Sequence, residues 1–491
     1  MINPLHFDID PARLPELVAT ALGSGGDWCD LFFEDTVYTT LLLRDGEVSS
    51  GGSHVDYGCG IRVLCGEKTG YAYAESIAWP DLTLAAKSAG AIASARYASK
   101  LSVRGSAPNI PRGSRPCIPS EPASAVRADA LMPSVATVAL DWRRTATSEF
   151  VPVLQAIESR IRAKDSRVHK VMASLAWQVS EILMYNSLGE TIRDTRPIGS
   201  VVVTTVFVQD GKSEISNASR SFSTGAEMIT DTLLDELVEQ AVRGIDERFE
   251  ARRPKGGKMP VVMGAGASGI LLHEAMGHAF EADFNRKGQS IFSGKMGKSV
   301  ARKGINIVDD GTIAGNRGFC RWDDEGSPGQ KTYMVEDGIL RSYLHDRISA
   351  KFFGVAPTGN GRRESFRYNP IPRMRCTYME SGADGTLEDI ISSVKKGIFV
   401  DQFSNGQVKI GEGDFTFYVK SGCLIENGRL TMPVKDINIV GNGPRALADI
   451  VAVAGDLKID DGTWTCGKEQ SVPVSCGIPS VLVKQLTVGG E

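Results

Sequence analysis

The sequence predicts an α+β fold: an N-terminal domain of mixed helices and antiparallel sheet, then a β-rich C-terminal domain carrying the helix around His273 and His278. Three observations support this prediction. The chain has 491 residues, too many for one ordinary core. Helical spacing alternates with strand-like runs in the first half, whereas strands separated by tight turns dominate the second. Residues 252–257 (RRPKGG) indicate a linker, so we place the domains at residues 1–253 and 254–491.

The N-terminal domain is expected to contain four helices and a set of strands. Alanine-rich or amphipathic segments predict helices at residues 11–22, 79–97, 149–163 and 227–249. Runs rich in apolar and β-branched residues predict strands at residues 30–34, 39–43, 60–64, 69–74, 171–179, 182–185, 191–194 and 201–209. Between residues 106 and 133, six prolines interrupt every periodic pattern, which indicates an extended crossing segment or a flexible loop.

Two short turn sequences predict hairpins in the C-terminal domain. Asp337-Gly338 separates strand-like residues 333–335 from 339–340, and Asn427-Gly428 separates residues 423–425 from 429–431. Asp-Gly and Asn-Gly favour tight hairpin turns because these residues tolerate a positive φ.

Composition narrows the classes of function. A net charge of −4 gives no electrostatic reason to expect binding to nucleic acid or to an anionic membrane. Residues 1–8 lack the features of a secretory signal, and apolar runs such as 201–208 are far shorter than the about 20 residues of a membrane span. The nine cysteines are scattered and odd in number, which argues against a disulfide framework. We therefore expect a cytoplasmic protein that binds neither nucleic acid nor membrane.

A glycine-rich segment could indicate a nucleotide site. Residues 264–269 (GAGASG) match G-x-G-x-x-G between a short strand and a helix, a pattern that binds pyrophosphate in dinucleotide folds. That fold also needs a second strand ending in an acid about 20 residues on. The next clear strand, at residues 305–308, lies beyond this window. We favour a strand-to-helix turn that needs small residues for close packing, and keep a nucleotide-binding oxidoreductase as the weaker alternative.

The segment His273-Glu274-Ala275-Met276-Gly277-His278 has the form H-E-x-x-x-H. On a straight α-helix its two histidines would lie about 140° apart and could not share an ion. A π-bulge, one i→i+5 turn, would bring them nearly into line, and Gly277 is where the backbone yields most easily. The alternative is that both histidines are ordinary helix residues.

A metal ion held by two histidines would need a third protein ligand. Glu281 and Asp283 lie just downstream and could supply a carboxylate. Cys466, within the small-residue loop at 460–468, could supply a thiolate. Spacing alone does not decide between them.

Five separated motifs occur in order along the second half of the chain. They are residues 273–288 (HEAMGHAFEADFNRKG), 323–330 (DDEGSPGQ), 357–365 (PTGNGRRES), 466–469 (CGKE) and 486–490 (LTVGG). Through these motifs, residues 263–490 closely resemble the TldD family of metallopeptidases, in the TldD/PmbA superfamily. One departure is that Glu469-Gln470-Ser471 lacks the glycine that is usual before the glutamine.

The resemblance implies a zinc ion (Zn²⁺) held by His273, His278 and Cys466, with Glu274 as the catalytic glutamate. It implies a peptidase of unfolded or leader-like peptides, paired with a TldE (PmbA) paralogue that lacks the metal motif, or forming a homodimer. A scaffold subunit without activity is the alternative.

Such a zinc ion leaves a position for water and lowers the pKa of that water to about 7. We expect Glu274 to take its proton and return it to the leaving amine. The candidate oxyanion donors or substrate contacts are Tyr343, His345, Arg362 and Arg363. We expect an extended peptide to pair with an exposed strand edge of the β-rich domain.

Overall fold

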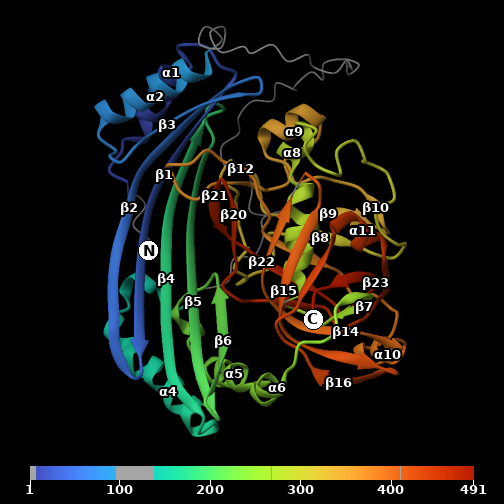
Figure 1. The fold of residues 1–491 in the computed structure, drawn as a ribbon. Coiled ribbons are helices and arrows are strands. Elements are labelled where there is room, and N and C mark those ends of the chain that lie inside the picture. The colour runs from blue at the N-terminus through green and yellow to red at the C-terminus, as the bar shows by residue number, and fades with distance from the viewer. Residues whose placement is uncertain (1–6, 95–137, 267, 410, 491) are drawn as a thin grey trace.

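The N-terminal half is built on one six-stranded antiparallel sheet with the order β3-β2-β1-β4-β5-β6 (Figure 1). The computed structural model describes residues 7–94, 138–266, 268–409 and 411–490, so the proline-rich segment predicted at 106–133 lies outside the described residues. The strands of the sheet are β1 Trp28–Arg44, β2 Glu47–Cys65, β3 Lys68–Ala74, β4 Val168–Asn186, β5 Thr191–Gln209 and β6 Lys212–Phe222. Several are far longer than the runs predicted from sequence, because each joins two predicted strands.

Helices cover both ends of this sheet. Near one end lie η1 Pro11–Arg13, α1 Leu14–Leu22 and α2 Trp79–Ala93, and near the other lie η3 Trp142–Arg144, η4 Thr147–Phe150, α4 Val151–Lys164, η5 Ala226–Met228, α5 Asp231–Val242 and α6 Ile245–Glu250. Each group buries its own apolar core against the strands. The alternation of buried residues along β5, with Val201, Val203 and Phe207 pointing inward, is the period-2 pattern of a sheet with one buried face.

The single long helix predicted at residues 227–249 is wrong. The segment contains η5, α5 and α6, and α5 ends at Val242. Gly244 has a φ of 71°, a left-handed conformation that glycine adopts without steric cost and that ends a helix.

The C-terminal half contains two larger sheets. The first follows the order β14-β7-β23-β17-β15-β16, and β14 also pairs with β15, so five of its strands form a closed ring. Its members, including β18 paired with β23, are β7 Gly257–Met263, β14 Lys396–Lys409, β15 Asp414–Glu426, β16 Arg429–Pro433, β17 Asn438–Asn442, β18 Ile450–Val453 and β23 Val481–Val488.

The second sheet has the order β10-β9-β8-β13-β22-β19. Its strands are β8 Ile307–Asp310, β9 Lys331–Glu336, β10 Ile339–Leu340, β13 Cys376–Met379, β19 Lys458–Asp460 and β22 Ser475–Ile478. Two small two-stranded sheets are β11 Gly361–Arg362 with β12 Ile371–Pro372, and β20 Thr465–Lys468 with β21 Gln470–Pro473. The helices are α7 Gly269–Leu272, η6 His273–Gly277, η7 His278–Phe280, α8 Ala282–Arg286, α9 Arg347–Phe353, α10 Leu387–Ser392 and α11 Gly443–Ala448. This β-rich half confirms the predicted α+β class.

Both predicted hairpins of the C-terminal half are present. β9 and β10 turn at Asp337 and Gly338, with φ of 50° and 77°, and β15 and β16 turn at Asn427 and Gly428, with φ of 50° and 76°. These dipeptides were predicted to form tight turns because both residues tolerate a positive φ, and both residues of each turn have one.

The two halves are joined by buried polar contacts between distant parts of the sequence. Arg62 on β2 forms an ion pair with Glu325 at 2.5 Å, and Arg196 on β5 pairs with Asp324. Glu34 on β1 accepts a hydrogen bond from the backbone N–H of Phe366 at 2.6 Å. The N-terminal sheet is thereby fixed against the loops around residues 324 and 366.

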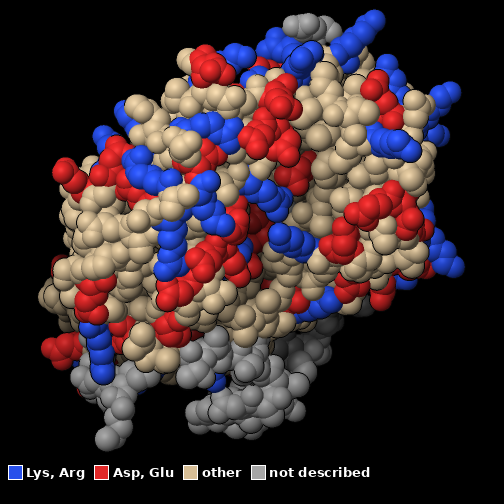
Figure 2. Space-filling model, turned by 90° about the horizontal axis from the view of Figure 1, so that it is seen from below, with Lys and Arg blue, Asp and Glu red and all other residues tan. Residues whose placement is uncertain are grey.

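The surface face in Figure 2 carries Lys and Arg interspersed with Asp and Glu, without one large area of a single sign. Among the helices of the described ranges, none has both the length and the apolar content that crossing a membrane requires.

Candidate metal centre

The candidate centre lies where β7 passes through the glycine-rich turn into α7. A Cβ on Gly269 would lie 2.7 Å from the backbone nitrogen of Gly477 on β22, so the helix packs directly on the strand backbone. This contact supports the interpretation that small residues serve close packing here. The next strand along the chain, β8, begins only at Ile307.

The turn that carries the two histidines is a π-helix, η6, spanning His273–Gly277. The predicted π-bulge is therefore present, and the imidazole centroids of His273 and His278 are 5.3 Å apart with an interplanar angle of 79°. η6 is packed among β13, β14 and β15, between the ring and the second sheet.

Gly277 is required for a different reason from the one expected. Its φ of −58° is ordinary for a helix, so no special backbone freedom is used. A Cβ at this position would lie 2.2 Å from the sulfur of Met374, which is fully buried. The glycine therefore makes room for the methionine beside the π-turn.

His273, His278 and Cys466 converge in the interior. One ligand atom from each lies within 4.8 Å of the others, and the Nε2 of His278 is 3.3 Å from the Sγ of Cys466. The three residues are 1%, 3% and 1% exposed. The part of the chain that the structure describes contains no second group of three such side chains with this geometry.

The donor set fits a zinc ion. Ligand atoms about 2.0–2.3 Å from a tetrahedral metal lie roughly 3–4 Å from one another, close to the spacing here. Apart from the nearby thiol of Cys466, neither ring nitrogen of His273 has a hydrogen-bond partner among the described residues. A buried polar atom without a partner costs about 1–3 kcal/mol, and coordination would remove that cost for one nitrogen.

Electrostatics favour the thiolate form of Cys466. Burial raises the pKa of the thiol, but the adjacent His273 and His278 lower it more, and the pKa falls from 9.0 to about 4. The thiolate is the form of cysteine that binds metals.

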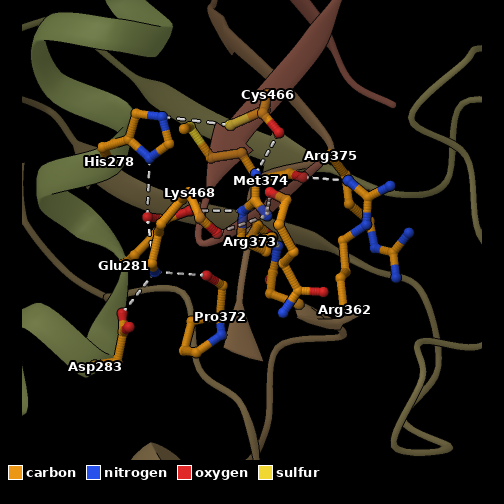
Figure 3. Close-up of polar contacts among 12 residues, drawn as sticks. His278, Glu281, Asp283, Arg362, Pro372, Arg373, Met374, Arg375, Cys466 and Lys468 are labelled. Carbon is orange, nitrogen blue, oxygen red and sulfur yellow. Dashed lines mark hydrogen bonds and ion pairs between the residues drawn. The ribbon is translucent and has the colours of Figure 1, made fainter. Parts of the chain in front are cut away.

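Glu281 and Asp283, the alternative third ligands, face a lysine instead (Figure 3). The Nζ of Lys468 lies 3.0 Å from Oε2 of Glu281 and 2.9 Å from Oδ1 of Asp283. Oε2 of Glu281 also lies 2.9 Å from Nδ1 of His278. Burial raises the pKa of Glu281, but Lys468 and His278 lower it more, to about 2. The carboxylate therefore accepts the Nδ1 proton of His278, which directs Nε2 toward Cys466.

Lys468 and Arg373 are residues that sequence reasoning missed. Arg373 is fully buried and donates to the backbone carbonyls of Cys466 at 2.6 Å and Gln470 at 2.7 Å, so it holds the β20–β21 hairpin in place. For these two residues, the only sign in the sequence of a place near the metal centre is that Lys468 lies two residues after Cys466.

Glu274 is the most exposed of the motif residues whose side chains the structure describes. Its side chain is 26% exposed, whereas that of His278 is 4% exposed, and its Oε2 lies 3.9 Å from Nε2 of His278. The carboxylate is thus both close to the buried trio and partly open to solvent, so it can meet a water molecule.

The four other candidates have contacts elsewhere. Tyr343 donates to the carbonyl of Phe292 at 2.7 Å, and His345 packs against it, with burial lowering the pKa of His345 to about 4. Arg362 donates to two backbone carbonyls, and Arg363 donates to the carbonyl of Asp324. Among the described contacts, none of these four touches the trio or Glu274, and their roles stay predictions.

Comparison with known proteins identifies the family. Profiles described as the PmbA/TldA metallopeptidase domain 1, central domain and C-terminal domain match residues 29–93, 141–245 and 256–490. The "Metalloprotease TldD homolog" of Haemophilus influenzae is 36% identical over 471 residues, covering 94% of this chain and 93% of that protein. The chain belongs to the TldD/PmbA family of metallopeptidases.

One further relative and one solved structure are also similar to this chain. The "Zinc metalloprotease TldD homolog" of Saccharolobus solfataricus is 32% identical over 259 residues, covering 52% of this chain and 57% of that protein. The crystal structure of TldE from Thermococcus kodakarensis has a TM-score of 0.71 at 18% identity, covering 97% of this chain and all of that one. The latter shows that the fold is shared.

The β20–β21 hairpin accommodates the departure from the TldD/PmbA motif. Glu469 forms the turn between β20 and β21 with a φ of 58°, the left-handed conformation that glycine adopts most readily. The hairpin register, with Lys468 opposite Gln470 and Cys466 opposite Val472, is complete. The path of the loop that carries Cys466 is therefore formed without the usual glycine.

Proposed function

We propose that this TldD/PmbA-family chain is a zinc-dependent peptidase that hydrolyses unfolded or leader-like peptides. His273, His278 and Cys466 hold the metal, and Glu274 is the general base. The observation that carries the proposal is the convergence of two imidazoles and a low-pKa thiol, with His273 lacking any other partner. The relative from Saccharolobus solfataricus that is named a zinc metalloprotease supports the choice of metal.

When bound, zinc would polarise the scissile carbonyl and acidify the attacking water. Glu274 accepts a proton from that water while the water oxygen bonds to the carbonyl carbon. The same carboxylate then gives the proton to the amide nitrogen as the C–N bond breaks, which releases an amine. Glu281 keeps the His278 ring in one orientation throughout, through the 2.9 Å contact with Nδ1.

An extended peptide is expected to bind by main-chain pairing to a strand edge, since this gives affinity with little sequence preference. Peptides methylated on alternate backbone nitrogens should then be cleaved more slowly than the same peptides without methyl groups. Equal cleavage of the methylated and unmethylated peptides would exclude binding by main-chain pairing. The working unit would be a homodimer or a pair with a TldE-type chain.

The deciding experiment is Glu274→Gln, which keeps the shape of the side chain and removes the base. We expect peptide cleavage to fall by about 10²- to 10⁴-fold with bound zinc unchanged. The exposed Glu336→Gln, on β9, is the matched control and should retain full activity. Unchanged cleavage by Glu274→Gln would exclude this mechanism. If that cleavage also required a co-purified TldE-type partner, the scaffold alternative would be favoured. NADH binding detected by fluorescence would instead support the oxidoreductase.

A further inference from the structure

A second feature lies between the two halves of the molecule. A cavity of about 690 Å³ separates the N-terminal sheet from loops of the C-terminal half. Phe32 and Gln178 on β1 and β4 belong to one wall, and residues 317–321, 362–365 and Pro473 belong to the other. Its volume falls within the range of about 300–1,000 Å³ that is usual for ligand sites.

The lining of this cavity is rich in arginine. Among the described residues that line it, arginines outnumber carboxylates by eight to six. Some of these arginines form ion pairs with lining carboxylates, as Arg196 does with Asp194. The guanidinium groups of Arg317, Arg362 and Arg375, in contrast, form no hydrogen bond or ion pair with a carboxylate within the described part of the chain. The cavity thus holds three guanidinium groups without a direct ion pair, although the charges of Asp323 and Asp324 act on Arg375 from nearby, and that of Asp324 acts on Arg362.

Neutral groups hold these three arginines in place. Arg362, 6% exposed, donates to the carbonyls of Met374 at 2.5 Å and Pro473 at 2.7 Å. Arg375, 5% exposed, donates through Nε to the carbonyl of Gly359 at 2.7 Å. Carbonyl oxygens orient a guanidinium but supply no full negative charge. Burial and the neighbouring Arg375 lower the pKa of Arg362 to about 9, although the charge of Asp324 raises it in part.

Arg317 shows the same pattern. Its Nε donates to the carbonyl of Trp464 at 3.0 Å, and its Nη1 donates to the hydroxyl of Ser221 at 2.7 Å. Burial lowers its pKa to about 10. An anion in the cavity would meet fixed donors that have lost much of their hydration, an arrangement that strengthens binding of a carboxylate.

The cavity adjoins the hairpin that carries Cys466. Thr465 pairs with Pro473, and Cys466 pairs with Val472. The carbonyl that Arg362 binds belongs to Pro473, the residue next to the pairing partner of Cys466. Figure 3 shows Arg362 and Arg375 beyond Met374, on the far side from His278. A peptide with its scissile bond at the candidate centre could therefore extend over this hairpin into the cavity.

We propose that Arg317, Arg362 and Arg375 bind a carboxylate of the peptide substrate, in the cavity between the N-terminal sheet and the β20–β21 hairpin. This inference rests on the proposed peptidase function. The carboxylate is either that of an acidic side chain or that of the peptide's C-terminus, because both present the same planar pair of oxygens to a guanidinium.

The first test measures binding without cleavage. Fluorescently labelled decapeptides of one sequence, with glutamate or glutamine at two positions and with a free or amidated C-terminus, are titrated into zinc-loaded full-length Glu274→Gln protein. We expect at least about tenfold weaker binding when the recognised carboxylate is removed, and the four peptides show which carboxylate it is. Equal affinity for all four overturns the proposal. A preference in binding without any cleavage by the wild-type protein would preserve this site and remove the proposed function.

The second test locates the site. Arg362→Gln and Arg317→Gln should each reduce the ratio of affinities for the acidic and neutral peptides toward one. Arg341→Gln is the matched control, because Arg341 lies away from the cavity, is half exposed and pairs with Glu336. If Arg362→Gln does not fold, the less buried Arg317→Gln still decides. A wild-type ratio in folded Arg317→Gln protein, judged by its circular dichroism and melting temperature, overturns the assignment.

Discussion

The Nδ1 of His278 and the Oε2 of Glu281 lie 2.9 Å apart, and both residues are buried. The same oxygen lies 3.0 Å from Nζ of Lys468, which follows Cys466 by two residues. One carboxylate therefore connects the helix that carries the histidines to the hairpin that carries the thiol. The geometry on both sides of the candidate centre depends on this carboxylate.

Glu281→Gln should weaken metal binding although Glu281 is not expected to touch the metal. The variant keeps the size of the side chain but loses the negative charge that fixes the His278 tautomer and pairs with Lys468. Loss of such a partner typically lowers metal affinity about 10- to 100-fold. Zinc retention during dialysis against graded chelator concentrations measures the effect, with the exposed Glu412→Gln as control. Equal retention in the two variants would show that Glu281 does not position His278.

Cys466→Ser should lose zinc and peptide cleavage together. A serine hydroxyl is not ionised at neutral pH, whereas the neighbouring histidines keep the pKa of Cys466 at about 4. We expect a larger loss of affinity than the about 10- to 100-fold predicted for Glu281→Gln. Elemental analysis of the purified protein gives the zinc content. Cys423→Ser, which removes a half-buried thiol on β15, is the control, and full zinc occupancy in Cys466→Ser would refute the assignment of this ligand.

Gly269→Ala should destabilise the protein and displace the metal helix. The new Cβ would meet the backbone of Gly477 at 2.7–2.9 Å, and a backbone cannot move aside as a side chain can. Forcing extra volume into a packed site costs about 1–3 kcal/mol of unfolding free energy. Denaturant melts compare this variant with Gly52→Ala, whose Cβ would meet nothing within 4 Å. A melt identical to that of the control would mean that α7 and β22 do not pack this closely.

Local signals explain which parts of this architecture the sequence predicts. The Asp337-Gly338 and Asn427-Gly428 turns follow from two residues each, and the π-turn follows from the five-residue spacing of His273 and His278. The choice of Cys466 over Glu281 did not follow from spacing, and came only from the resemblance to a family. The role of Lys468 depends on a contact with Glu281 across 187 residues of sequence, which no local pattern contains.

The helix predicted at residues 227–249 is wrong for a different reason, because here a local signal was present in the sequence. The apolar spacing continued through the segment, but Gly244 lies inside it and takes a left-handed conformation. A single glycine in the left-handed conformation therefore ends the helix, although the helical periodicity of the apolar residues continues past it. The arginine cavity was also beyond prediction, since its two walls come from β-strands and loops that meet only in the folded chain.

Stability should depend on pH through Glu34, which lies on β1 at the contact with Phe366. Burial raises the pKa of this carboxyl from 4.5 to about 7, although Thr36 and the Phe366 N–H donate hydrogen bonds that lower it in part. The folded state therefore binds the proton more tightly than the unfolded state. The stability that protonated Glu34 contributes is fully present below about pH 4.5 and is lost as the pH rises through about 7.

Glu34→Gln tests this directly, because glutamine stays neutral at every pH and can still accept from the Phe366 N–H while donating to Thr36. We expect the variant to lose less stability than the wild type between pH 5 and pH 8, since it has no charge to bury. Denaturant-unfolding curves recorded at several pH values give the free energy of unfolding of the wild type and of the variant. The exposed Glu16→Gln on α1 is the control and should follow the wild-type curve. Parallel curves for the wild type and Glu34→Gln would mean that Glu34 is already ionised in the folded protein at pH 5.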